Sequence, residues 1–522
     1  MRTKKSIYNV LVTIVYYIVV TVIGLFLRKV FLSVLGVGYV GLDTVFANIL
    51  SLLSLVELGI GPAITYRLYK PLAENDHKTV TLLMEVYKKF YRYVGLAVSF
   101  FGIIIAFFIP YIVNDPPIDN NFELIICYFL FLSSTVASYF HAYKRSLLVA
   151  DQRQYVASII DIIFNIAVFI AKVVILYFTG NYILVLIINL LRVILGNVFI
   201  SIKCNKDYSY LKSKYKSDKK SIKSLAKEMV VDIKYILLHK FCSYIYASTD
   251  GIVISSFMGV NSVGYLANYN MIANVINNLF MQCASSIQSS IGNLVNSVKD
   301  NLEPVKTNLN RLSYIYYSIL NFTTISLFCL LTPFIKLWIG YDYVISTSIV
   351  LVISVNMFVY SFYQPIANIY TVLGLFKKDK FTSALAAAVN LVVSVAAVVL
   401  LNYYYPDSDK GLIGVYFGTI LGSLIYFIFR TNIVYKKYFK ESPWSYYKVF
   451  FKYFVITLIS GAITFSATYF MGEGILWFCA KILTCIIIPN AINVIIFHKS
   501  EEYKYVKNLV SKILHKKQKG NE

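Results

Sequence analysis

Apolar runs of about 20 residues follow one another along almost the whole chain, with only short polar connections between them. As a helix, such a run spans the ~30 Å hydrocarbon core of a bilayer and satisfies every backbone group where water is absent. A transmembrane barrel would show short segments of alternating polarity instead. The chain is 58% hydrophobic, above the ~45–50% apolar content of soluble domains. The sequence therefore predicts an all-α integral membrane protein.

The apolar runs divide into fourteen expected membrane spans. The first run follows Arg2, Lys4 and Lys5, as in a secretory signal, but it is too long and no small-residue cleavage site follows. We therefore interpret it as a span. The expected spans are 7–34, 42–70, 85–113, 121–149, 153–178, 181–204, 230–257, 265–298, 310–338, 344–375, 378–402, 411–438, 448–470 and 475–498.

Basic residues alternate from one connection to the next. One set of connections contains a single basic residue, Lys410, and it comprises 35–41, 114–120, 179–180, 258–264, 339–343, 403–410 and 471–474. The other set, with both termini, carries the lysines and arginines behind the net charge of +23. The positive-inside rule places this second set and both termini in the cytoplasm. Because the charge is dispersed among short connections, we expect no nucleic-acid partner.

The longest polar stretch divides the chain into lobes. Between Tyr208 and Met229, apolar side chains recur at helical spacing and lysines fill the other positions. This pattern predicts an amphipathic helix lying on the membrane surface. We expect an N-terminal six-helix lobe at 1–204, the linker at 205–229, a C-terminal six-helix lobe at 230–438, and two extra spans with a basic cytoplasmic tail at 439–522.

A short repeated motif supports two related halves. Leu35–Leu42 and Met258–Tyr265 share two glycines and two valines at an offset of 223 residues. A weaker echo relates Arg153 and Asn165 to Lys378 and Asn390 at an offset of 225. Transporters built from parallel repeats hold their substrate between the halves, near the middle of the membrane.

Six ionisable side chains stand out inside the expected spans: Arg28, Glu57, Asp161, Lys172, Arg192 and Asp250. Such groups are costly in a bilayer and functional by default. Arg28, Lys172 and Arg192, with the adjacent Lys29, form a cationic wall that suits a diphosphate. A structural interpretation also stands. In it, Arg28 and Lys172 snorkel to the outer interface and Arg192 pairs with Glu57 or Asp161.

The acidic groups have their own alternatives. The repeat offset places Asp250 at the same membrane depth as Arg28. Asp250 is then either an external gate partner of Arg28 or one member of a buried pair with no role in transport. Glu57 and Asp161 are candidates for a gate or for coupling to H⁺ or Na⁺. The alternative is that each is a buried carboxylate with a structural role.

Polar side chains also follow one face of the span at 265–298. The members of interest are Asn270, Asn274, Asn277, Gln282 and Ser285. Such a stripe either lines a cavity and binds sugar hydroxyls, or joins helices through amide hydrogen bonds.

No pattern for covalent chemistry is present. The external connections are at most about ten residues long and lack histidine, the seven cysteines have no zinc spacing, and no phosphate-binding glycine loop occurs. We expect no enzyme activity, no metal and no cofactor, apart from a coupling ion, H⁺ or Na⁺.

The sequence resembles the polysaccharide flippases of the MOP exporter superfamily. The resemblance lies in Leu35–Leu42, Glu57–Gly61, Tyr69–Ala73, Thr249–Gly251, Ser255–Gly259 and Val263–Tyr269, in that order and spacing. It implies a V-shaped pair of six-helix bundles in a bacterial cytoplasmic membrane. It also implies that an undecaprenyl-diphosphate-linked oligosaccharide is turned from the inner to the outer leaflet for capsule or exopolysaccharide synthesis, with cationic residues meeting the diphosphate. Membrane lipids, a polysaccharide polymerase and glycosyltransferases are the other partners it implies.

Two other functions stay open at this point. The first is a cation-coupled multidrug exporter of the same fold, which should favour acidic cavity groups. The second is a membrane polymerase or ligase of lipid-linked glycans, which should carry a functional external loop. Lipid II itself is disfavoured as cargo, because lipid II flippases tend to place more than one arginine in the first span.

Overall fold

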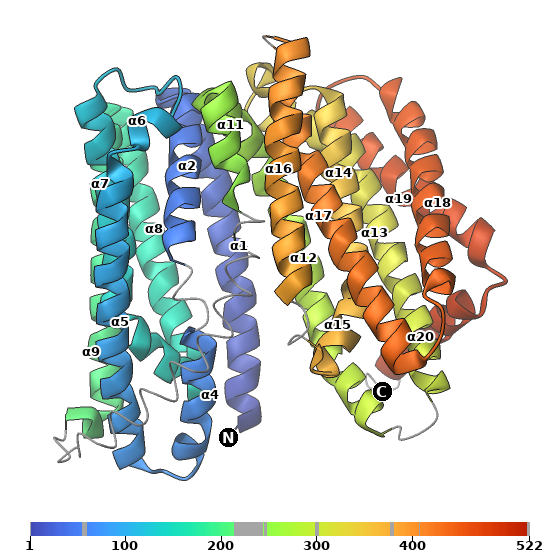
Figure 1. Ribbon diagram of the computed structural model, residues 1–522, viewed down its shortest axis with the longest axis horizontal. Coiled ribbons are helices and arrows are strands. Elements are labelled where there is room, and N and C mark those ends of the chain that lie inside the picture. Colours follow the sequence, from blue (N-terminus) through green and yellow to red (C-terminus); the bar gives the residue numbers. More distant parts are fainter. Residues whose placement is uncertain are drawn as a thin grey trace. The chain divides into compact units, whose positions relative to one another are not determined.

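The computed structural model describes residues 2–54, 60–212, 244, 248–297, 302–375, 380–406 and 408–518. All regular structure in these residues is helical (Figure 1). The chain packs as two compact units, Met1–Gly264 (unit 1) and Tyr265–Glu522 (unit 2).

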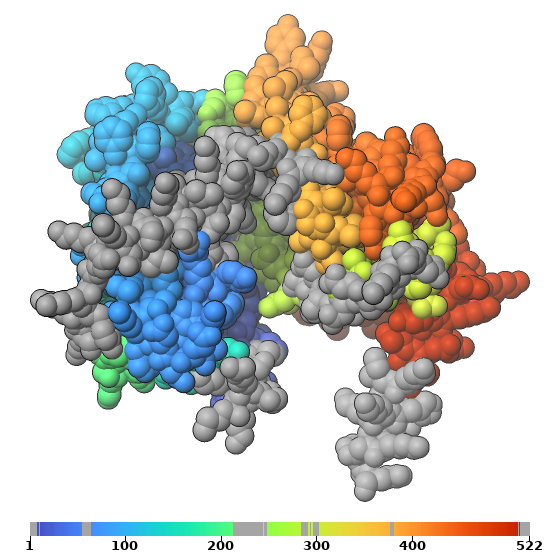
Figure 2. All heavy atoms as spheres, turned by 60° about the horizontal axis from the view of Figure 1, so that its bottom comes forward, coloured from blue at the N-terminus to red at the C-terminus, as the bar shows by residue number. Residues whose placement is uncertain are grey.

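Unit 1 is built on long helices that pack around α7. Its elements are α1 (Arg2–Val34), α2 (Val37–Leu53), α4 (Ile60–Ala73), α5 (His77–Ala106), α6 (Ile109–Ile112), α7 (Asn121–Ala150), α8 (Gln154–Thr179), α9 (Tyr182–Asp207), the 3₁₀ turn η1 (Ser209–Lys212), α11 (Asp250–Met258) and the first turn of α12 (Val260–Ser297). Side-chain caps begin three of these helices, because Asp76, Asn120 and Asn181 each accept a hydrogen bond from a backbone N–H of the first turn. The turn between α4 and α5 lies on the surface, at the end of unit 1 that faces the viewer in Figure 2.

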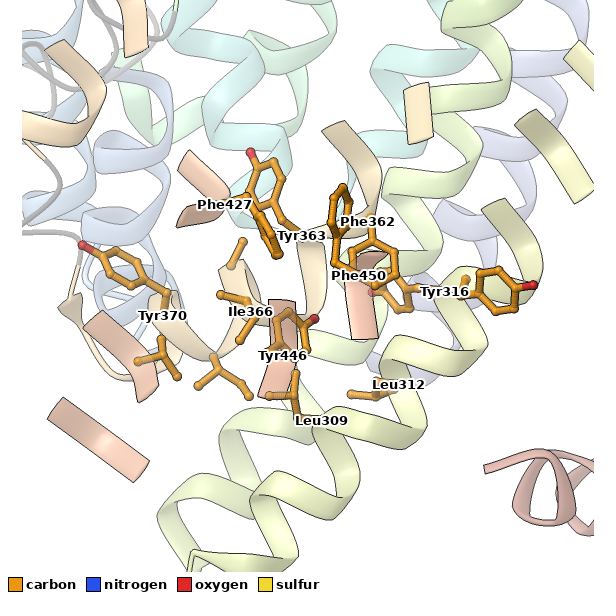
Figure 3. Packing of buried hydrophobic residues seen from close by; sticks show 14 of the residues in the cluster. Leu309, Leu312, Tyr316, Phe362, Tyr363, Ile366, Tyr370, Phe427, Tyr446 and Phe450 are labelled. Atoms are coloured by element: carbon orange, nitrogen blue, oxygen red, sulfur yellow. The ribbon is translucent and has the colours of Figure 1, made fainter. Parts of the chain in front are cut away.

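Unit 2 is held together by aromatic side chains. After α12 come α13 (Glu303–Trp338), the 3₁₀ turn η2 (Tyr341–Tyr343), α14 (Thr347–Phe362), α15 (Gln364–Val372), α16 (Lys380–Tyr404), α17 (Gly411–Ile433) with a π turn (Val434–Phe439), α18 (Trp444–Tyr469), α19 (Ile475–Phe497) and α20 (Glu501–Gln518). Figure 3 shows how Tyr316, Phe362, Tyr446 and Phe450 from α13, α14 and α18 meet in one cluster. Stacked and edge-on rings of this kind contribute beyond the area they bury.

The two helices after the second lobe, α18 and α19, pack against α13 of unit 2. Rings of Tyr317 and Tyr453 stack at 4.1 Å, the Ser313 and Tyr446 hydroxyls hydrogen-bond at 3.0 Å, and the Asn493 amide donates to Ser318 at 3.3 Å. All three contacts run from α13 to α18 or α19. The last two spans are thus packed parts of unit 2.

Eleven helices within the described residues are long and apolar enough to cross a membrane. They match the expected spans except 42–70, 230–257 and 265–298. The first is divided between α2 and α4, the second is described only around α11, and the third is α12, which has the length but carries the polar stripe. The number fourteen stays a prediction, as does the surface helix at 208–229, which lies outside the described residues beyond Lys212.

The two copies of the repeated motif cross each other within unit 1. A Cβ atom on Gly41 would lie 1.9 Å from the carbonyl oxygen of Val260, and one on Gly264 would lie 2.2 Å from that of Val37. Val260 and Gly264 are Val37 and Gly41 displaced by 223 residues, so the contact is reciprocal. Only glycine permits this approach of two backbones. Unit 1 therefore extends past the expected lobe boundary and includes α11 and the start of α12 from the second half.

Candidate functional site

A cluster of charges lies inside unit 1 where four helices meet. Arg28 is on α1, Asp43 on the second turn of α2, Lys172 on α8, and Tyr182 is the first residue of α9. The Tyr182 hydroxyl donates a hydrogen bond to the Asp43 carboxylate. Both cations are within electrostatic range of that carboxylate. The cluster is thus centred on Asp43.

Aromatic packing fixes the position of Tyr182. Its ring lies 4.8 Å from the Tyr39 ring and 6.1 Å from the Phe31 ring, measured between centroids. Tyr182 is buried, and the N-cap of Asn181 sets the start of α9 directly before it. The hydroxyl that holds Asp43 is therefore placed by the ends of α1, α2 and α9 together.

Neither cation is neutralised by direct contact. In the part of the chain that the structure describes, Arg28 and Lys172 form no ion pair within 4.0 Å, and both act on Asp43 from farther away. Each is partly buried. An ammonium or guanidinium group held in this way keeps hydrogen-bond donors for an incoming anion.

Arg192 faces a small cavity between α7 and α9. The cavity has a volume of about 150 Å³, and Ser134 and Asn189 contribute polar groups to its wall. The Nε atom of Arg192 is buried and has no hydrogen-bond partner among the described residues. Lys172 lies within electrostatic range of Arg192, so the three expected cations do gather in one unit.

The other expected charged residues lie elsewhere. Lys29 is exposed on α1. Asp161 accepts two hydrogen bonds from Arg145, at 2.7 and 3.0 Å, so its partner in this structure is Arg145 rather than Arg192. Asp250 begins α11, and among the described residues Asp43 is the acid whose charge acts on Arg28. Glu57 lies outside the described residues.

The polar stripe on α12 joins helices at two of its positions. Asn270 accepts a hydrogen bond from the Tyr416 hydroxyl at 2.6 Å, and Asn277 accepts one from Ser361 at 3.4 Å. Asn274 and Gln282 are exposed, and the side chain of Ser285 lies outside the description. Asn270 and Asn277 thus follow the helix-joining alternative, while Asn274 and Gln282 stay candidates for contact with sugar.

Sequence reasoning missed Asp43 and Tyr182. The expected span began at residue 42, which placed Asp43 at the membrane border, whereas α2 begins at Val37 and carries Asp43 into the bundle. A carboxylate directly after the glycine motif was the available signal. Tyr182 could not be singled out among 45 tyrosines.

Unit 2 contains two further features of interest. Thr324, Phe328, Phe358 and Phe454 are among the side chains that line an apolar groove of about 260 Å³ between α13, α14 and α18. Between α16 and α17, the Asn390 amide donates to Thr419 at 3.1 Å, in a seam of neutral polar groups. The described residues contain no group of three or more His, Cys, Asp or Glu that could hold a metal ion.

Comparison with known proteins decides the family. A family model described as "Polysaccharide biosynthesis protein" matches residues 3–288, more than half of the chain. The chain belongs to the polysaccharide biosynthesis protein family. No curated protein matches the sequence.

Solved structures show which fold this family member adopts. The lipid II flippase MurJ, in an inward closed conformation, has a TM-score of 0.67 at 17% identity over 94% of this chain and 99% of that chain. An inward-facing MATE multidrug transporter of the MOP superfamily has a TM-score of 0.57 at 15% identity, covering 78% and 93%. A MOP superfamily transporter from Pyrococcus furiosus, for which a binding pocket of reverse polarity suggests a different function, has a TM-score of 0.54 at 14% identity, covering 83% and 96%. The predicted all-α transporter fold, shared with these flippase and exporter structures, is therefore confirmed.

Proposed function

We propose that the protein is a flippase for lipid-linked oligosaccharides. It turns an undecaprenyl-diphosphate-linked repeat unit from the inner to the outer leaflet by alternating access, for capsule, exopolysaccharide or another surface polysaccharide. Its place is the bacterial cytoplasmic membrane, with both termini inside. Membership of the polysaccharide biosynthesis family and the MurJ-like fold support this assignment.

One observation carries the proposal: the cations of this cluster in unit 1 outnumber its acid. Asp43 acts on Arg28 and Lys172, Arg192 lies within electrostatic range of Lys172, and none of the three cations is in an ion pair within the described residues. Unpaired cations are expensive in a bilayer unless a ligand of opposite charge visits them. A diphosphate supplies that charge, and guanidinium groups bind its oxygens with directed hydrogen bonds.

The same imbalance argues against a drug exporter. An exporter of organic cations needs acidic groups to meet its substrate, and the cluster in unit 1 is net basic. A polymerase or ligase is disfavoured by the short external connections, such as Gly340 to Ser346 between α13 and α14. We further propose that an ion gradient or the membrane potential drives the cycle, because a charged headgroup moves across the field.

Complementation of a flippase-deficient strain, together with a proteoliposome assay of a fluorescent lipid-linked oligosaccharide, tests the proposal. Arg28→Ala and Arg192→Ala should each lower flipping about 10-fold or more, because each removes a charge-assisted contact of about 1.5–3 kcal/mol. Lys70→Ala is the matched control, since Lys70 is an exposed lysine of the same unit. Lys29→Ala should have a smaller effect than Arg28→Ala.

Two results would overturn the assignment. Full activity in both arginine variants would remove the diphosphate site. Glycosyl transfer to a lipid-linked acceptor without any translocation would identify an enzyme instead.

A further inference from the structure

A lipid-facing groove runs between α8 and α9 at the end of unit 1 where α9 finishes and α8 begins. Its volume is about 440 Å³. Ile159, Ile160, Phe199 and Ile202 are among the side chains that form its apolar wall, and Lys203 and Lys206 form its mouth. The lysines lie on the last two turns of α9, at the end that carries the basic connections.

The apolar wall is unusually open. Ile159 is 43% exposed, Phe199 53% and Ile202 58%, so these side chains face outward rather than into the bundle. Phe199 lies eight residues before the end of α9, about 12 Å from that end at ~1.5 Å per residue. The wall therefore lies at the depth of the first carbons of an acyl chain, with the lysines at the depth of a headgroup.

Cations dominate the mouth of the groove. Lys203 donates to Asp207 at 2.8 Å, and Arg153 donates to the other oxygen of the same carboxylate at 2.6 Å. Lys206 is exposed and has no hydrogen bond or ion pair in the described part of the chain. Asp151, on the adjacent turn, accepts a hydrogen bond from Tyr208 and does not line the groove. Two cations, Lys203 and Arg153, thus share one carboxylate, and the third cation, Lys206, is left without an acid among the described residues.

We propose that this groove binds an anionic phospholipid of the surrounding membrane. One acyl chain lies along Ile159, Phe199 and Ile202, and the phosphate lies between Lys203 and Lys206. Basic pockets between helices at the cytoplasmic surface bind anionic headgroups, and a lysine near the surface contributes about fivefold in affinity. The groove is separate from the proposed substrate site. It lies at the N-terminal end of α8, whereas Arg28 and Lys172 lie toward the C-terminal ends of α1 and α8.

Photo-crosslinking of the full-length purified protein tests the proposal. The probe is phosphatidylglycerol with a diazirine in its acyl chain, and the labelled peptides are identified by mass spectrometry. Labelling is expected on α8 around Ile159 and on α9 around Phe199. Unlabelled phosphatidylglycerol should compete at a lower concentration than phosphatidylcholine.

Variants separate the headgroup from the chain. Lys206→Gln should weaken binding of phosphatidylglycerol about fivefold and leave phosphatidylcholine unchanged. Ile159→Trp, which fills the groove, should weaken both lipids. Lys70→Gln changes an exposed lysine on α4 and should change neither. Circular dichroism checks that each variant stays folded.

Three outcomes would overturn the inference: labelling confined to other helices, equal competition by the two phospholipids, or Lys206→Gln binding as tightly as the unmodified chain. Undecaprenyl phosphate is the last competitor. Displacement of the probe by undecaprenyl phosphate at lower concentration than by phosphatidylglycerol would make the groove a substrate site, and would also contradict the inference.

Discussion

The two units surround a partly buried arginine in opposite ways. Arg430 in unit 2 is surrounded by tyrosines, with its guanidinium carbon 4.6, 5.4 and 5.8 Å from the ring centroids of Tyr426, Tyr370 and Tyr363. Arg192 in unit 1 borders a cavity, and its Nε has no partner among the described residues. The first arrangement stabilises the charge within the protein, whereas the second leaves it for something else to bind.

The interactions that hold the helices together also differ between the two units. Unit 2 relies on aromatic stacking and on neutral hydrogen bonds, such as those of Ser313 with Tyr446 and of Asn390 with Thr419. Among the described residues, unit 1 places Arg28, Lys172 and Asp43 between its helices without closing them into ion pairs. Internal ion pairing therefore does not account for Arg28 and Lys172, which are cations that the function proposed above assigns to the diphosphate.

The largest effect is expected at the glycine crossing, the element of unit 1 to which both halves of the sequence contribute. Gly41→Val places side-chain atoms where the Val260 carbonyl lies, so the helices must separate. We expect a loss of more than about 4 kcal/mol and little folded protein. Yield and thermal unfolding in detergent measure this.

Gly196→Ala is the matched control, because a Cβ there meets nothing within 4 Å and the residue lies in α9. It should be neutral or slightly stabilising, since alanine is the better helix former. If Gly41→Val stayed as stable as this control, the reciprocal crossing would not be a close backbone contact.

The next largest effect is expected at the two arginines compared above, Arg192 of unit 1 and Arg430 of unit 2. Arg192→Met should lower flipping about 10- to 100-fold and leave the unfolding midpoint unchanged, because this arginine makes no internal hydrogen bond through Nε. Arg430→Met should do the reverse, costing about 1–2 kcal/mol of stability through its lost ring contacts. A stability loss in Arg192→Met equal to that in Arg430→Met would end the distinction between the units.

Much of the fold follows from the apolar runs, because a bilayer leaves the chain few choices. The bounds of α7, α8 and α19 follow from the sequence to within one residue at each end. The break in the span at 344–375 does not, although Pro365 at the start of α15 was a local signal for it. Run length predicts that a helix crosses, but not where it bends.

The site was less accessible to sequence reasoning. Arg28, Lys172 and Arg192 could be selected because ionisable residues in spans are rare, but their partners depend on how helices rotate about their axes. Arg145 is an example. It lies in the last two turns of α7 and forms an ion pair with Asp161 of α8. The lengths of the two spans do not reveal that these two side chains face each other.

A smaller effect is expected where Tyr182 holds the central carboxylate. Tyr182→Phe keeps the ring contacts with Phe31 and Tyr39 but removes the hydrogen bond to Asp43. A hydrogen bond to a charged group is worth about 1.5–3 kcal/mol, so the unfolding free energy should fall by about 1.5 kcal/mol. Tyr177→Phe, at an exposed tyrosine of α8, is the control. Equal stability of the two variants would show that Asp43 does not depend on Tyr182.

The smallest effect is expected at the surface of unit 2, between α18 and α19. Glu473 accepts hydrogen bonds from Lys336 at 2.7 Å and from Tyr341, and these two donors hold the pKa of the Glu473 carboxyl below its ordinary value. A carboxyl whose pKa is lowered on folding stabilises the protein above its unfolded pKa, and that contribution disappears as the pH falls through the folded pKa. Unfolding midpoints measured from neutral to acid pH should therefore converge for the unmodified chain and Glu473→Gln. Because the pair is exposed, the gap at neutral pH should be slight. A gap that widened toward acid pH would contradict this sign, and a gap as large as that of Arg430→Met would mean that unit 2 depends on surface charge as much as on its rings.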